Sequence, residues 1–461
     1  MKFFSIALLA MASLAVASPA PEADADVVNL SDLTELIKTG EAKVVLENVA
    51  AEDCQLWQAV EVLAGAWTMA ANLDAEADAV TTHVARDRIA QRAVLTPTHT
   101  SFWPTPMAGI PSHQVAIVGM DDGTLGISEN VPLPELEDDM ILVRNAAVAL
   151  NPIDGKMVGN LASAGAIAGM DYTGTVVAMG PKVKTASDIG LGDRVCGAVQ
   201  GMHSLTPNVG AFAQFVGATD VVTLKVPSYM STQDAATLGS GIGTIGLALF
   251  RSMDVPGYPD SPAREKIPVL VYGGSTATGT LAIQLLKLSG LSPIATCSPH
   301  NFDLVKSFGA EAVFDYRLDT CTDDIRKHTR NSLKYVLDCI SEPETMQFCY
   351  KCIGRSGGKY TALEPFPQFL HTRPTVKPDW VLGPTLLGKR IGWGPPFERD
   401  GDPDVREFGI KWFATTQRLL DEGKLRTHPV RLMEGGFGGV LDGLEILRKK
   451  QVSGQKLVYI L

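Results

Sequence analysis

Strand-like and helix-like segments alternate from residue 232 to residue 362, and this alternation constrains the fold more than any other feature of the sequence. Short apolar runs followed by amphipathic runs of helix length are typical of a parallel sheet of the Rossmann type. The expected elements are helix 235–250, strand 269–272, helix 279–289, strand 293–296, helix 302–308, strands 312–314 and 335–338, a helix ending at 352, and strand 359–362. We therefore expect a doubly wound α/β domain over residues 232–375.

Two stretches flank this domain. Residues 111–231 are rich in glycine and β-branched residues, with many turns, which predicts a compact, partly open β-barrel. The strand patterns in it are 114–118, 140–149, 174–178 and 194–199. Residues 376–461 contain two helical patterns, 404–422 and 438–449, and a last strand-like segment. We expect this tail to return to the barrel and to close a cleft between barrel and sheet.

The first 110 residues differ from the rest. Residues 1–18 contain a lysine, a short apolar run and small residues, as a secretory signal peptide does, and the run is too short to span a membrane. Residues 19–110 carry 14 acidic and 5 basic residues and end in a proline-rich linker. They contain no chemical motif, so we expect a spacer or a misjoined upstream exon. No later segment is long and apolar enough to span a membrane.

Charge and cysteine content limit the partners and the compartment. A net charge of −11 leaves no basic surplus for nucleic acid. Seven cysteines without a regular framework indicate reduced thiols in a cytoplasmic enzyme, which conflicts with the signal-like start. Cys349 and Cys352 form a C-x-x-C pair, but no second pair stands at zinc-finger spacing, so we expect burial instead of metal binding.

The segment VLVYGGSTATGTLAIQLLKLSG, residues 269–290, joins an expected strand to an expected helix through a glycine-containing turn. Phosphate bound at a helix N-terminus needs free N–H groups and a close backbone approach. Gly273 and Gly274 allow a tight exit from the strand, while hydroxyl residues stand where a dinucleotide fingerprint has further glycines. Their hydroxyls would donate to phosphate oxygens instead. Taken alone, the turn also fits a protein that binds no nucleotide.

The end of the second strand indicates which dinucleotide would bind. NAD-selective proteins carry an acid about 20 residues after the turn, on the ribose 2′-hydroxyl. Here the strand runs into residues 298–301, SPHN, which contain no acid, so a 2′-phosphate would meet no repulsion. This favours NADPH over NADH. Tyr316 and Arg317 would close over the adenosine end, with a plain turn role as the alternative for each.

A set of further motifs stands in a familiar order: NPIDGK, GMDYTGTVVAMG, GDRVCG, GAFAQF, the turn above, ATCSPHNFDLVKSFGAEAVFDYR and YVLDCISEPETMQFCYKCIGR. Residues 114–461 therefore resemble the medium-chain dehydrogenase/reductase superfamily. More narrowly, YGGSTAT and ATCSPHNFDL resemble the fungal trans-acting enoyl reductases of iterative polyketide synthases, including the one in lovastatin biosynthesis. The resemblance implies a monomer with a GroES-like β-barrel, an inserted Rossmann-type sheet, and NADPH in the cleft. It also implies, as partner, a polyketide synthase, or its hybrid with a peptide synthetase, that presents a carrier-bound acyl chain.

The resemblance also implies site residues, carried over position by position. The cofactor would be bound by Ile153, Asp154, Gly155, Lys156, Ser275, Thr276, Ala277, Thr278, Ser298, Pro299, His300, Asn301, Tyr316, Leu363, Glu364, Leu457 and Val458. The acyl substrate would be bordered by Gly239, Ser240, Gly241, Ile242, Gly243, Thr244, Ile245, Gly246, Leu382, Gly383, Pro384, Thr385 and Leu386. Glu364 departs from the family, because the lovastatin enzyme has a neutral amide there. Its charge would either alter the pocket or point to solvent.

Two residues are the catalytic candidates. The Lys156 ammonium would stabilise negative charge that develops on the substrate, or relay a proton; binding of the cofactor ribose alone is the alternative. The Thr244 hydroxyl would bond the substrate or the nicotinamide, unless it only packs its helix. Asp171 and Tyr172 are expected to set a turn of the barrel instead of acting in catalysis.

A metal-free reaction is expected. Zinc-dependent members of the superfamily need thiolate, imidazole and carboxylate ligands. Their first His-Glu pair would fall at Met170 and Asp171, and a four-cysteine lobe is missing from the sequence. The resemblance then implies hydride transfer from NADPH to the β-carbon of an α,β-unsaturated thioester, followed by protonation of the α-carbon. Two other functions stay open: a stand-alone quinone or enal reductase, and an NADPH-binding protein without turnover.

Overall fold

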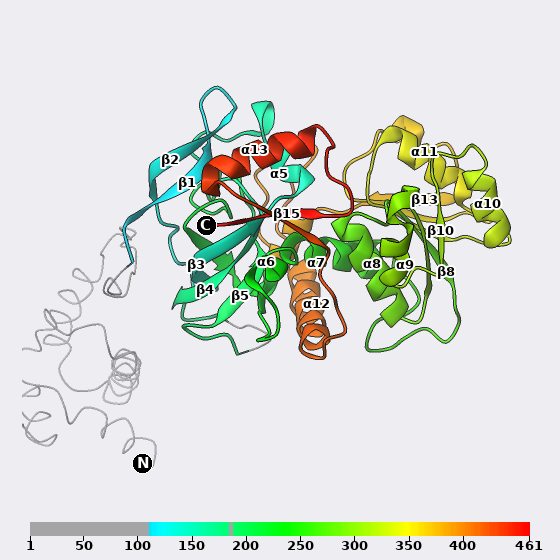
Figure 1. The fold of residues 1–461 in the computed structure, drawn as a ribbon, viewed down its shortest axis with the longest axis horizontal. Coiled ribbons are helices and arrows are strands. Elements are labelled where there is room, and N and C mark those ends of the chain that lie inside the picture. Colours follow the sequence, from blue (N-terminus) through cyan, green and yellow to red (C-terminus); the bar gives the residue numbers. More distant parts are fainter. Residues whose placement is uncertain (1–109, 184–187) are drawn as a thin grey trace, which may run out of the picture. The chain divides into compact units, whose positions relative to one another are not determined.

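A computed structural model describes residues 110–183 and 188–461 of the chain (Figure 1). The expectations for the signal-like segment 1–18 and for the acidic extension, apart from its last residue, lie outside the described residues. No helix in the described ranges is both long and apolar enough to cross a membrane.

A six-stranded parallel sheet forms one half of the described molecule. Its strand order is β10-β9-β8-β11-β12-β13. The strands are β8 (Pro268–Tyr272), β9 (Ser292–Thr296), β10 (Ala312–Phe314), β11 (Tyr335–Asp338), β12 (Gly358–Ala362) and β13 (Val376–Trp380). The chain order reverses beside β8, which places a topological switch point, the usual ligand position in such sheets, between β8 and β11. The sheet thus includes residues 376–380, beyond the expected boundary at residue 375.

Helices cover both faces of this sheet. Val269 and Val271 of β8 pack into one apolar cluster with α7 and α8, while Leu270 and Tyr272 pack into another with α10 and α11. The helices are α6 (Thr232–Ala235), α7 (Gly239–Gly246), α8 (Ala277–Leu288), α9 (Phe302–Ser307), α10 (Cys321–His328), α11 (Pro343–Cys352) and α12 (Pro403–Asp421). The alternation of strand residues between two helical layers confirms the doubly wound sheet. The single expected helix 235–250 is instead α6, α7 and a π-helical turn, η3 (Leu247–Ser252).

The other half is built from strands, as expected. A seven-stranded sheet of order β14-β15-β3-β4-β5-β7, with β6 beside β3, is accompanied by the hairpin β1–β2. The elements are β1 (His113–Gly119), β2 (Leu125–Pro132), β3 (Met140–Ala149), α5 (Pro152–Lys156), β4 (Asp171–Met179), β5 (Arg194–Ala198), β6 (Phe215–Thr219), β7 (Thr223–Lys225), β14 (Val430–Met433), α13 (Gly436–Arg448) and β15 (Lys456–Ile460). The last strand pairs antiparallel with β3, so the tail returns to the barrel and the parallel sheet is an insertion in it.

Candidate active site

A cavity lies between the strand-rich half and the parallel sheet. Its volume is about 820 Å³, including space open to solvent at its mouth. Its walls come from the end of β5, from α7, from the residues after β12 and from the segment after β13. The lining is largely apolar, and among the described residues that form it only Glu364 has an ionisable side chain. Such a cavity suits a small organic group with an apolar body.

Eight of the thirteen expected substrate residues line the cavity. They are Gly239, Ser240, Gly243, Thr244, Leu382, Gly383, Pro384 and Leu386. The other five, Gly241, Ile242, Ile245, Gly246 and Thr385, are not among its lining residues. A helix shows one face to a cavity, and the opposite face of α7 packs on its neighbours: a side chain at Gly241 would meet Leu281, and one at Gly246 would meet Trp412.

Aromatic residues that the sequence analysis did not single out complete the wall. Trp380, Trp393 and Phe397 line the cavity, and Phe397 makes edge-on ring contacts with both tryptophans at centroid distances of 6.0 and 6.4 Å. The indole N–H of Trp393 donates to the Met202 carbonyl at 3.0 Å, which fixes its ring. Two of these aromatic residues belong to WGPPF, residues 393–397. The glycine and prolines of this segment indicate a turn, but they do not show where the turn lies in the fold.

Lys156 and Glu364 meet at the edge of the cavity. Their side chains form an ion pair that joins the end of α5 to the segment after β12. Both side chains stay partly exposed, at 49% and 33%. Glu364 therefore neither points only to solvent nor stands alone: it neutralises and positions the lysine. Ile153 and Leu363 line the cavity beside this pair.

The Thr244 hydroxyl is available for a ligand. Thr244 lines the cavity, and within the described ranges its side chain has no protein hydrogen-bond partner. Gly383 lies opposite, since a Cβ added there would come 3.4 Å from the hydroxyl oxygen. The Thr244 hydroxyl is thus free to donate to a ligand, whereas the hydroxyl of a threonine that only packs its helix would be enclosed by protein atoms.

The turn before α8 presents backbone donors. The N–H groups of Ser275, Ala277 and Thr278 have no acceptor among the described residues, and they lie at the N-terminus of a 12-residue helix. This arrangement fits a phosphate group, because unpaired N–H groups and the helix dipole both favour an anion. Gly279 keeps the helix close to the turn, since a Cβ there would lie 2.4 Å from the Gly273 carbonyl oxygen.

One expectation about this turn needs correction. The Thr276 hydroxyl accepts from Gly279 N–H at 2.9 Å and donates to the Gly273 carbonyl at 2.8 Å. It is the N-cap of α8, and its single proton is used within the turn. The Thr278 hydroxyl lies 3.2 Å from it. Phosphate would therefore be held mainly by backbone N–H groups, with the Ser275 and Thr278 hydroxyls as further donors.

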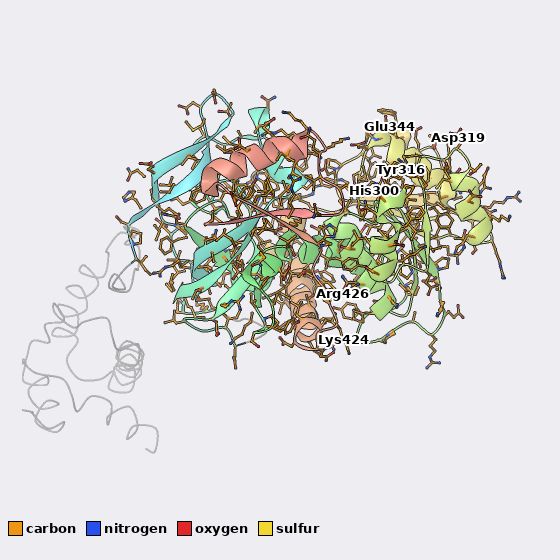
Figure 2. All side chains as sticks on the ribbon, in the orientation of Figure 1. His300, Tyr316, Asp319, Glu344, Lys424 and Arg426 are labelled. Atoms are coloured by element: carbon orange, nitrogen blue, oxygen red, sulfur yellow. The ribbon has the colours of Figure 1, made fainter. Side chains whose placement is uncertain are left out.

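The segment after β9 lies on the same edge of the sheet. Ser298 Oγ is 3.4 Å from the Tyr316 hydroxyl, and Pro299 to Asn301 form the short helix η4 (Pro299–Asn301). Figure 2 labels His300 and Tyr316 in the half that contains the parallel sheet. Arg317 pairs with Asp315, the residue after β10, at 2.9 Å, and its place over the adenosine end stays a prediction.

A buried polar network lies behind α5. The carboxylate of Asp171 accepts from Lys456 Nζ at 2.6 Å, from Asn151 Nδ2 at 2.9 Å and from Ser240 N–H at 2.6 Å. Asp154 points into this network and accepts from Asn151 N–H at 2.7 Å; burial raises the pKa of its carboxyl to about 7. Asp171 thus acts as a structural anchor for α7, whose Ser240 lines the cavity.

The remaining expected cofactor residues lie in the framework. Gly155 packs on α13, where Arg448 Nε donates to its carbonyl at 2.8 Å. Leu457 and Val458 are fully buried in β15 and do not line the cavity. No cavity contact supports a direct role for these residues or for the Asp154 side chain, so their assignment to the cofactor stays a prediction.

The donor set does not fit zinc. In the parts of the chain that the structure describes, no group of three or more His, Cys, Asp or Glu side chains could hold a metal ion. Met170 lines the cavity where zinc-dependent members carry histidine, and thioether sulfur is a poor zinc ligand. Cys349 and Cys352 are buried and unpaired, as expected.

These features define a class. A GroES-like barrel that carries an inserted parallel sheet, with a cavity between them and a phosphate-suited turn at the switch point, makes the chain a medium-chain dehydrogenase/reductase. Residues 137–228 match the alcohol dehydrogenase GroES-like domain, and residues 277–362 match the family described as zinc-binding dehydrogenase. Members of this class use a nicotinamide cofactor.

Within this class the chain belongs to the trans-enoyl reductases. It is 83% identical over 355 residues to the trans-enoyl reductase FSL5 of Gibberella zeae, an alignment that covers 77% of this chain and 99% of the relative. It is 51% identical to the trans-enoyl reductase fsa3 of a Fusarium species, over 76% of this chain and all of the relative. The crystal structure of CurK enoyl reductase has the same fold, with a TM-score of 0.57 at 17% identity over 76% of this chain and 99% of that one. The protein is an enoyl reductase.

Proposed function

We propose that the protein reduces the α,β-double bond of a polyketide thioester with NADPH, acting in trans on an acyl chain attached to a carrier domain. The observation that carries this proposal is the apolar cavity, because the residues after β12 and β13 line it and it lies beside one ion pair and one open hydroxyl. An apolar chain would fill the cavity while its polar thioester meets those two groups.

The choice of NADPH rests on the edge residues. Unpaired N–H groups at the start of α8 suit the diphosphate, and Ser298, His300 and Asn301 offer neutral donors to a 2′-phosphate. Two acids near this edge are already paired: Asp315 with Arg317, and Glu342 with Lys450. A phosphorylated dinucleotide would therefore meet no free carboxylate from these two side chains.

When bound, the cofactor supplies the hydride that the β-carbon receives. Addition at the β-carbon moves negative charge onto the thioester oxygen, and the Thr244 hydroxyl is placed to donate to it. Glu364 holds the Lys156 ammonium in place at the edge of the cavity, where its N–H groups can donate to the oxygen that gains charge or relay a proton. The open mouth of the cavity admits water, from which the α-carbon takes its proton.

The partner and the compartment follow from the same chemistry. Relatives named trans-enoyl reductases suggest action on an acyl chain that another protein carries, and we propose a polyketide synthase, or its peptide synthetase hybrid, as that protein. Since NADPH is maintained inside cells, we propose a cytoplasmic site of action and a monomer, because one described chain contains every wall of the cavity.

The test is turnover with matched substrates. Purified protein with NADPH should reduce a 2-enoyl thioester attached to a carrier domain, and should act more slowly on simple quinones and enals. Equal rates with quinones would favour a stand-alone quinone reductase. Binding of NADPH without any oxidation of it by thioester, quinone or enal would favour a binding protein.

A further inference from the structure

The linker between α13 and β15, residues 449–455, crosses from the strand-rich half to the edge of the parallel sheet (Figure 1). We propose that this linker completes the pocket for the 2′-phosphate of the cofactor, and that Ser453 determines the preference for the phosphorylated dinucleotide. The inference rests on the proposed use of NADPH and adds to it a residue from the tail of the chain, far in sequence from the turn and the second strand.

Ser453 contacts His300 and Asn301, two of the neutral donors proposed for that phosphate. Its hydroxyl oxygen lies 3.0 Å from His300 Nε2 and accepts from Asn301 Nδ2 at 2.9 Å. Ser453 and His300 are exposed, while Asn301 is 93% buried at the start of α9. A solvent-accessible hydroxyl, an imidazole and a fixed amide therefore converge on one spot directly after β9.

Two further contacts hold the linker in this place. Gly454 has a φ of +65°, and a Cβ there would lie 2.8 Å from Asn301 Oδ1, so the backbone approaches Asn301 as only glycine allows. Lys450 donates from Nζ to Glu342 Oε1 at 2.5 Å, at the N-terminus of α11. The linker is thus fastened at both ends to loops at the carboxyl edge of the sheet.

The chemistry of this spot suits a phosphate. Since Asn301 donates to Ser453 Oγ, the serine proton remains free to be donated, either to His300 or to an anionic oxygen. Hydrogen bonds to charged oxygens are stronger than those between neutral groups. Lys450 of the same linker pairs with the carboxylate of Glu342. A 2′-hydroxyl, as in NADH, offers this group of donors no negative charge.

The test compares binding of NADPH and NADH by fluorescence titration, without substrate. Ser453→Ala should weaken NADPH binding roughly tenfold, the size expected for one lost hydrogen bond to a charged group, and should change NADH binding less than about twofold. Ser453→Thr should retain most of the preference, because it keeps the hydroxyl. Ser307→Ala, an exposed serine of α9 whose hydroxyl bonds only its own helix, is the matched control and should bind both nucleotides as the parent does.

Three outcomes of this titration would overturn the role of Ser453, and they differ in what they imply for the proposed function. If the parent prefers NADPH and Ser453→Ala keeps the full preference, the inference is overturned while the proposed function stands. If the parent binds both dinucleotides equally, the proposed choice of NADPH falls, and the role of Ser453 with it. Loss of NADPH and NADH binding to the same extent in Ser453→Ala would also overturn the inference, since it would show a structural role for the linker without phosphate selectivity.

Discussion

Lys156 and Glu364 show how a charged residue at the cavity is accommodated at the level of single residues. The carboxylate of Glu364 pairs with a lysine from the other half of the molecule. Because both side chains are partly exposed, the pair itself contributes little to folding stability. We expect this ion pair to act instead on catalysis, because it sets the charge at the cavity and the position of the Lys156 ammonium.

Substitution of the lysine should therefore lower turnover more than substitution of the glutamate. Lys156→Met removes the positive charge and should reduce kcat for an enoyl thioester by roughly tenfold or more. Glu364→Gln leaves the ammonium in place and should keep kcat within about threefold. Steady-state kinetics at saturating NADPH measures both. If Lys156→Met were as active as the parent, Lys156 would have no role in the chemical step and would at most bind the cofactor.

The open hydroxyl of Thr244 supports a second expectation. Thr244→Val preserves the shape and removes the donor, so kcat should fall roughly 10- to 100-fold, while KM changes little, because the bond strengthens only as charge develops on the oxygen. Thr244→Ser should recover most of the loss. If the valine variant keeps its kcat, the threonine is a packing residue, which was the alternative from the sequence.

At the level of elements, helix α7 shows why glycine occurs inside a helix although it lowers helix stability: its neighbours pack too closely for a side chain. Each glycine inside a helix costs about 1 kcal/mol relative to alanine, yet α7 contains four of them. A Cβ on Gly239 would lie 2.0 Å from the Gly197 carbonyl oxygen, and one on Gly246 would lie 2.1 Å from the Trp412 indole nitrogen. The glycines let the helix touch the barrel on one side and α12 on the other.

Gly246→Ala should therefore destabilise the protein, although alanine is the better helix former. We expect the free energy of unfolding to fall by about 2 kcal/mol or more, since Trp412, fully buried and donating to the Ile242 carbonyl at 2.8 Å, would have to move. Gly438→Ala in α13 is the control: no atom lies within 4 Å of its added Cβ, so its stability should stay equal or rise slightly. Urea unfolding compares the two, and equal effects would contradict this account of α7.

The sequence predicted the elements better than it predicted which face of each element meets the cavity. Periodicity identified β8, α8, β9 and β12 to within a few residues, because apolar runs and glycine turns are local signals. It missed β13, whose alternating charges in VKPDW look like a loop, and placed the helix of 235–250 without its breaks. The cavity role of Trp393 depends on its bond to Met202, a contact 191 residues apart that no local pattern reveals.

The polar network behind α5 joins elements from distant parts of the chain. Lys456 of the last strand, Asp171 of β4 and Asn151 before α5 share hydrogen bonds, and Asp171 reaches the first turn of α7. One oxygen of the neighbouring Asp154 carboxyl is buried without a partner. Burial, the main cause, and the nearby Asp171 charge both favour the protonated form of Asp154.

Stability should therefore depend on pH through Asp154. The pKa is near 4 in the unfolded chain and about 7 in the folded protein, so between these values the folded state binds more protons. The contribution of Asp154 to stability is thus full below pH 4, declines as the pH rises and is gone above pH 7. Asp154→Asn should gain stability relative to the parent as the pH rises from 4 to 7, by at most about 1.4 kcal/mol per pH unit, and the difference should level off above pH 7.

Urea unfolding of parent and variant at several pH values measures this difference. Asp319→Asn, an exposed carboxylate without a hydrogen-bond partner in the described structure, is the control and should show no such trend (Figure 2). A constant difference between Asp154→Asn and the parent across this range would show that Asp154 is ionised in the folded protein.

The central claim is that a nicotinamide dinucleotide and an enoyl thioester meet in the cavity between barrel and sheet. The most direct measurement uses NADPH that carries deuterium at the transferable position of its nicotinamide, with a carrier-bound 2-enoyl thioester and the purified protein. The account predicts a saturated product with one deuterium at the β-carbon and a solvent proton at the α-carbon. A reduced product without deuterium at the β-carbon, or no reduction while NADPH remains bound, would contradict it.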